Sequence, residues 1–184
     1  MNIPNLLSIS RILAVPVFIV LMLEPTPLRA LWAGIVFSLA SITDWLDGYL
    51  ARKWGQVTKI GKLLDPVADK ILIASALIML VETDSSHVPS WMAIIIIGRE
   101  IAVTGLRAMA AGDGVIIPAE STGKFKVGAQ VTAVLSFIFS YPIGSAWPRA
   151  EWPVYLGRSA LWLAIFLALY SGGQYFVNYW KKLE

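Results

Sequence analysis

Six apolar stretches dominate this sequence, and each is about as long as a membrane-spanning helix. Such a helix needs about 20 mostly apolar residues. The chain of 184 residues is 57% hydrophobic and 15% charged, whereas a soluble domain carries about 25% charged residues. The stretches are residues 5–23, 28–51, 64–82, 89–111, 122–141 and 154–178. We therefore predict an all-α, polytopic membrane protein with six transmembrane helices in a single bundle.

The segments between these stretches are typical of connectors. EPTPLR, ETDSSHVPS and YPIGSAWPRAEWP are rich in proline, glycine and serine, and none is long enough to separate two domains. We predict one domain over residues 1–182, with residues 183–184 left out as a cloning remnant. The polar opening of the first stretch, from Asn2 to Arg11, predicts that its first turns lie on the membrane surface as an amphipathic segment.

Lysine and arginine positions predict the orientation of the chain. The connector ARKWGQVTKIGK holds four cations, Arg107 lies near the end of the fourth stretch, and Lys124 and Lys126 lie at the start of the fifth. Cytoplasmic loops carry an excess of such residues. We therefore interpret the net charge of +3 as an excess of lysine and arginine in cytoplasmic segments, and not as a sign of nucleic-acid binding. The predicted location is a bacterial plasma membrane, which the chain crosses several times with its site facing the cytoplasm.

Composition also excludes several kinds of chemistry. The chain has no cysteine, so disulfides, thiolate metal sites and a cysteine nucleophile are excluded. Its single histidine, His87, lies in the polar connector ETDSSHVPS, and one histidine does not make a zinc site.

Four aspartates stand where the second and third stretches meet their cationic connector. Asp44 and Asp47 are three residues apart, and Asp65 and Asp69 are four apart, so a helix places each pair on one face. Because the two helices are antiparallel neighbours, both pairs are expected near the cytoplasmic end. Four clustered carboxylates require added positive charge. Hard divalent cations such as Mg²⁺ or Mn²⁺ prefer oxygen ligands, and two ions about 4 Å apart would suit phosphoryl chemistry.

Each aspartate alone also has an ordinary structural explanation. Asp65 could cap a helix that begins with Pro66. Ion pairs could join Asp69 to Lys70 and Asp47 to Arg52. Four aspartates at one depth favour a functional site, because ionisable groups within a span are costly and rare.

Small and cationic residues accompany the aspartates. Gly48 and Ala51 each follow an aspartate by about one turn and leave a strip where a ligand could approach the backbone. Close helix packing explains these two residues equally well. Arg52 supplies a planar cation suited to phosphate. Gly61 is expected to let the connector turn before the third helix.

Together these residues form the pattern D-x2-D-G-x2-A-R-x8-G-x3-D-x3-D, from Asp44 to Asp69. It resembles the signature of the CDP-alcohol phosphotransferase family and matches at every fixed position. Members of that family are membrane-embedded, metal-dependent and typically homodimeric. They transfer a phosphatidyl-type group from a CDP-linked donor to an alcohol and release CMP.

The resemblance implies roles for individual residues. Metal ligation would fall to Asp44, Asp47 and Asp65, with Asp69 as a further ligand or as the general base that deprotonates the acceptor. The CDP group would be bound by Asp44, Gly48, Ala51, Arg52 and Gly61. The implied cofactor is Mg²⁺ or Mn²⁺, as two ions, and the acyl chains of the donor would stay in membrane lipid.

Basic residues in the second half predict an acceptor that itself carries a phosphate. Arg99 and Arg107 are about two helical turns apart, and Lys124 and Lys126 begin the fifth stretch. The four are candidates for a phosphate-binding patch. Simpler explanations are an ion pair between Arg99 and Glu100, snorkelling of Arg107 to the interface, and lipid contact by the two lysines.

The segments GREIAVTGLR and GKFK resemble the phosphatidylglycerophosphate synthase branch of the family, whose acceptor is sn-glycerol 3-phosphate. The expected substrates are therefore CDP-diacylglycerol and sn-glycerol 3-phosphate. Phosphatidylinositol-phosphate synthase also uses a phosphorylated acceptor and is the nearest alternative.

A divalent-cation transporter is the alternative from a different class, because acidic residues in a membrane can line a transport path. The aspartates cluster toward one face and not near the midplane, and a transport path does not explain Arg52 or the basic patch. A membrane scaffold without catalytic activity is disfavoured, because removing four clustered carboxylates from water costs free energy that such a protein would not need to spend.

Overall fold

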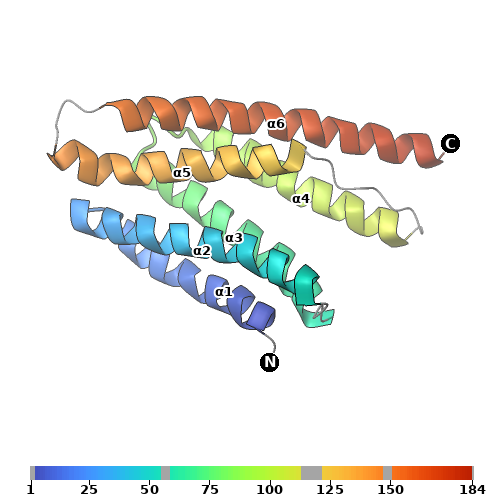
Figure 1. Cartoon of the computed structure of the whole chain (residues 1–184). Helices are drawn as coiled ribbons and strands as arrows, with labels where there is room; N and C mark the ends of the chain where they lie inside the picture. Colours follow the sequence, from blue (N-terminus) through green and yellow to red (C-terminus); the bar gives the residue numbers. More distant parts are fainter. Residues whose placement is uncertain (1–2, 55–58, 113–121, 147–150, 184) are drawn as a thin grey trace.

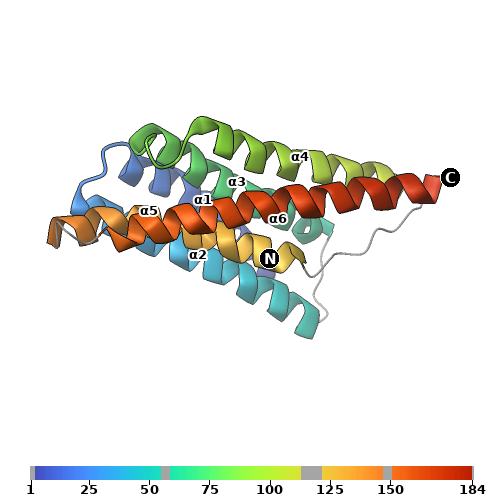
Figure 2. The same ribbon diagram turned by 90° about the horizontal axis from the view of Figure 1, so that it is seen from above.

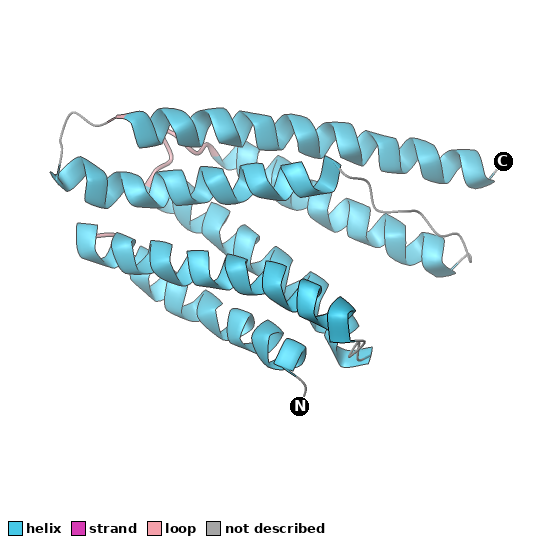
Figure 3. Ribbon diagram, viewed as in Figure 1, coloured by secondary structure: helices cyan, strands magenta, loops and turns pink. Residues whose placement is uncertain are grey.

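The computed structural model describes residues 3–54, 59–112, 122–146 and 151–183, and these form helices without any strand. The helices are α1 (Ile3–Met22), α2 (Pro27–Trp54), α3 (Lys59–Thr83), α4 (Ser90–Gly112), α5 (Thr122–Ala146) and α6 (Trp152–Leu183). Figure 1 and Figure 3 show them as a bundle of antiparallel helices. The prediction of an all-α chain with six helices is confirmed.

The structure supports membrane insertion for fewer segments than it shows as helices. Within the described residues, two helical segments are long and apolar enough to span a bilayer, Phe125–Ile143 and Trp152–Trp180. The described side chains of α1 and α2 include shorter apolar segments, Leu7–Met22 and Pro27–Thr43. Six spans therefore remain a prediction.

The bundle has two packed groups of helices that meet along α2, α3 and α5 (Figures 1 and 2). The first group is α1 with α2 and α3, and the second is α6 with α4 and α5. Phe18, Phe37 and Phe137 are fully buried in the shared core. Helices α2 and α5 approach closely because Gly34 has no side chain, and a Cβ there would lie 2.7 Å from the Phe139 ring.

Two details of the predicted boundaries are wrong. Helix α3 begins at Lys59, so Gly61 lies inside a helix and not in a turn, and Asp65 is not an N-cap for Pro66. A proline disfavours helix at the preceding residue without forbidding it. Helix α5 continues to Ala146 past Pro142, and the hydroxyl groups of Ser140 and Ser145 donate to backbone carbonyls within its last turns.

At the N-terminal end, helix α1 is continuous from Ile3, with no separate element before it in the described part. Ser8 and Arg11 pack into the bundle at 0% and 1% exposure, while Ser10 is exposed. Contact of these first turns with the membrane surface stays a prediction.

Candidate active site

The two aspartate pairs lie at matching depths on α2 and α3. Asp44 and Asp47 are ten and seven residues before the end of α2, while Asp65 and Asp69 are six and ten residues after the start of α3. At 1.5 Å per residue, this places Asp44 and Asp69 each about 15 Å from the connected helix ends. The two pairs therefore lie on consecutive helices at similar distances from the connector, and their approach to one another stays a prediction.

The side chains of most motif residues fall outside the part of the structure that is described. These residues are Asp44, Asp47, Gly48, Ala51, Arg52, Gly61 and Asp65. Convergence of the four carboxylates on shared ions therefore stays a prediction. Among the described side chains, no group of three or more acidic, histidine or cysteine residues is placed to hold a metal ion.

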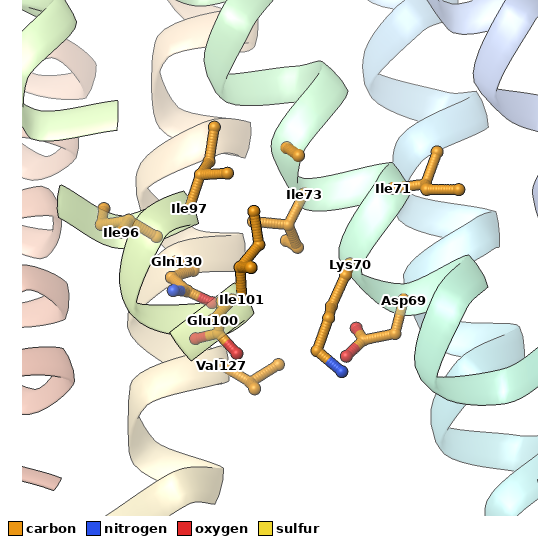
Figure 4. Close-up of a pocket in the computed structure, with 11 residues that line it drawn as sticks. Asp69, Lys70, Ile71, Ile73, Ile96, Ile97, Glu100, Ile101, Val127 and Gln130 are labelled. Carbon is orange, nitrogen blue, oxygen red and sulfur yellow. The ribbon is translucent and has the colours of Figure 1, made fainter. Parts of the chain in front are cut away.

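Asp69 is the motif residue whose surroundings are described. It is half-buried on α3 and lines a pocket of about 200 Å³ between α3, α4 and α5. Isoleucines form much of the wall, and the polar groups are Asp69, Lys70, Glu100 and Gln130. Figure 4 shows the carboxylates of Asp69 and Glu100 on opposite walls of this pocket.

Glu100, on the wall of this pocket, forms hydrogen bonds with two of the predicted phosphate-binding residues. Its Oε1 atom accepts hydrogen bonds from Arg99 Nη1, at 3.3 Å, and from the Lys126 ammonium group. Lys126 is 5% exposed and also interacts electrostatically with Asp69. Lys126 thus binds Glu100, which lines the same pocket as the candidate general base.

Arg99 is held mainly by α6. Its Nε donates to the Ala168 carbonyl at 3.0 Å, and its Nη2 donates to the Ser171 hydroxyl at 2.7 Å. Gly172 allows this contact, because a Cβ there would lie 3.3 Å from Arg99 Cγ. With the bond to Glu100, all three guanidinium nitrogens donate to acceptors of the protein.

Arg107 also contacts α6, but it keeps an exposed position. Its guanidinium carbon lies 4.7 Å from the centre of the Tyr175 ring, and Nη2 donates to the Tyr175 hydroxyl. Tyr175 is 3% exposed and belongs to a small core with Val103, Leu106 and Ala110. The side chain of Lys124 lies outside the described part.

Three contributors to this region were not identified from the sequence as site residues. Gln130 lines the pocket one turn beyond Lys126, and Ser171 and Tyr175 hold the two arginines. A polar residue inside an apolar helix was the available signal for Gln130 and Ser171. Glu100 was considered only as a partner of Arg99, and its bond to Lys126 was not predicted.

The comparisons agree with this architecture. The family model of CDP-alcohol phosphatidyltransferases matches residues 1–170, so the chain belongs to that family. A protein of Bacillus subtilis is 41% identical over 100% of this chain and 97% of its own length. Proteins of Pseudomonas fluorescens and Rickettsia bellii are 39% and 38% identical, over 100% and 95% of this chain and 93% of each relative. All three are named CDP-diacylglycerol–glycerol-3-phosphate 3-phosphatidyltransferase.

Proposed function

We propose that this chain transfers the phosphatidyl group of CDP-diacylglycerol to sn-glycerol 3-phosphate, and so produces phosphatidylglycerol phosphate and CMP. The observation that carries the proposal is the near full-length similarity, at 38–41% identity, to three relatives that bear the name of this activity. The intact aspartate pattern and the basic residues at the same end of the bundle support it.

The donor is bound at the aspartate end in this proposal. Asp44, Asp47, Asp65 and Asp69 form an all-oxygen donor set, which fits hard divalent cations such as Mg²⁺ or Mn²⁺. Two such ions, when bound, would neutralise the donor's diphosphate and make its phosphorus a better electrophile. Gly48, Ala51, Arg52 and Gly61, together with Asp44, line the CDP group.

Asp69 is the general base of the proposed reaction. Its carboxylate takes the proton of the acceptor's hydroxyl as that oxygen attacks the phosphorus that carries diacylglycerol. The bond from this phosphorus to the CMP oxygen breaks, and CMP leaves with the electron pair. Support comes from the position of Asp69, half-buried on the wall of a pocket of about 200 Å³.

The acceptor's phosphate is bound by basic residues of α4 and α5. Arg107 is exposed and is oriented by Tyr175, and Lys126 lies within electrostatic reach of Asp69. Lys124 precedes Lys126 on the same helix. Arg99 belongs to the predicted patch but contributes indirectly, because its hydrogen bond with Glu100 helps to hold that carboxylate in place.

The proposal includes the setting of the enzyme. The six helices span a bacterial plasma membrane, with the aspartates and basic residues facing the cytoplasm, and the protein works as a homodimer. Two helical segments of suitable length and apolarity support membrane insertion. The lysines and arginines of the α2–α3 connector support the orientation.

An assay on the purified full chain tests the function. It would contain CDP-diacylglycerol, labelled sn-glycerol 3-phosphate and Mg²⁺, with inositol 1-phosphate and serine as competing acceptors. We expect CMP release that depends on glycerol 3-phosphate and a lipid product that carries the label. Turnover with inositol 1-phosphate alone would identify the other branch of the family. Metal flux into liposomes without nucleotide, and without CMP release, would indicate a transporter.

A further inference from the structure

Arg99 and Glu100 form a small network that the proposed reaction does not use directly. Arg99 fastens α4 to α6 through Ala168 and Ser171. Glu100 fastens α4 to α5 through Lys126. The side chains of Arg99, Glu100 and Lys126 are 10%, 19% and 6% exposed, so water screens their interactions only weakly. The network thus connects three helices behind the pocket wall opposite Asp69.

Charge explains why the network depends on Glu100. Arg99 and Lys126 repel each other, and both are removed from water. A single carboxylate oxygen that accepts from both compensates for this repulsion. Without that charge, the flexible lysine would leave its position, because its four-carbon stem can reach other surroundings.

The position of Arg99 is itself fixed by neighbours on α6. All three of its nitrogens donate to protein acceptors, and its stem lies against Gly172. Three of its five N–H groups donate to the protein, and two of these three bonds direct the guanidinium at α6. The Lys126 ammonium group, in contrast, donates to Glu100, a residue that lines the pocket.

We propose that Arg99 and Glu100 are positioning residues, which hold the Lys126 ammonium group at Glu100, on the pocket wall opposite Asp69, so that it meets the acceptor's phosphate. This inference rests on the proposed function and refines the roles within its acceptor site. Arg99 binds α6 and not substrate. Glu100 transmits that fixed position to Lys126, and Lys126 makes the contact with phosphate.

Kinetics of a Glu100→Gln variant test the proposal. The exposed residue Glu82, at the opposite end of α3, provides the matched control Glu82→Gln. We expect Glu100→Gln to raise the KM for glycerol 3-phosphate about tenfold, the effect of losing one charge-assisted hydrogen bond, with kcat and the donor's KM little changed. Glu82→Gln should behave as the wild type. A fall in kcat alone, or equal changes in both KM values, would overturn the proposal.

A double-mutant cycle tests whether Glu100 acts through Lys126. In the Lys126→Met background, the further change Glu100→Gln should leave the acceptor's KM where Lys126→Met alone puts it. Multiplication of the two effects would mean that Glu100 works independently, which contradicts the proposal. A wild-type enzyme that releases no CMP with glycerol 3-phosphate would overturn the proposed function itself, before any variant is compared.

A gentler pair of variants keeps the test available if Glu100→Gln does not fold. Gly172→Ala places a methyl group 3.3 Å from Arg99 Cγ, whereas Gly173→Ala meets nothing within 4 Å. We expect Gly172→Ala to raise the acceptor's KM and Gly173→Ala to leave it unchanged. Identical kinetics for these two variants would show that the contact of Arg99 with α6 does not control the acceptor site.

Discussion

The two charged regions at one end of the bundle are built on opposite principles. The region on α2 and α3 collects four carboxylates, and its balance of charge depends on cations from outside the motif. The region on α4, α5 and α6 pairs its own charges, with Glu100 between Arg99 and Lys126. The difference teaches that charge can be balanced in two ways: the first region is proposed to bind cations together with a nucleotide, whereas the second holds Arg99 and Lys126 in place through an acidic residue of its own.

Removal of divalent cations is the strongest test of the proposed difference between the two charged regions. A chelator should abolish CMP release, because four clustered carboxylates repel one another and the donor's diphosphate when no cation is bound. Activity is expected to return when Mg²⁺ or Mn²⁺ is added in excess. Full activity of chelator-treated, metal-free protein would mean that the aspartates do not bind catalytic metal.

Asp69→Asn is expected to have the next largest effect. Loss of a general base typically lowers kcat by about 10²–10⁴. Asparagine keeps the size of the side chain, so binding of CDP-diacylglycerol, measured by equilibrium dialysis with labelled nucleotide, should change little. Near-normal turnover would remove Asp69 from the proton transfer and leave it a ligand or a structural residue.

Arg107→Ala should have a more moderate effect that is confined to the second region. One charge-assisted hydrogen bond to phosphate corresponds to about a tenfold rise in the acceptor's KM. The exposed Arg29, which pairs with Glu24 at the other end of the bundle, supplies the control Arg29→Ala. Steady-state kinetics with both substrates varied give the answer, and equal effects on donor and acceptor would place Arg107 outside the acceptor site.

Gly34→Ala tests the packing of α2 against α5, which connects the helices of the two regions. It should change the stability of the protein more than its kinetics. The new methyl group would meet the Phe139 ring at 2.7 Å. Overpacking of this kind costs about 1–3 kcal/mol. Thermal unfolding in detergent should therefore occur at lower temperature than for the wild type. Gly98→Ala, which meets nothing within 4 Å, is the matched control, and equal stability of the two variants would contradict the close approach of α2 and α5.

The helices and the aspartate motif were within reach of sequence analysis because both depend on residues close together in the chain. Hydrophobic runs predicted the six helices to within about five residues at each end, as expected for boundaries that depend on end effects. Gly61 was misread as part of a turn, since α3 extends upstream of Pro66. Spacing of three and four residues was enough to place each aspartate pair on one face.

Sequence alone therefore determined the helices of the described residues and the placing of an aspartate motif on two consecutive helices, because helical periodicity and short connectors are local properties. Tertiary structure decided which partners the basic residues of α4 and α5 find on the neighbouring helices. Glu100 and Lys126 are 26 residues apart, and Arg99 and Ser171 are 72 apart. Such contacts depend on how α4, α5 and α6 pack, and no local pattern encodes the rotation of one helix against another.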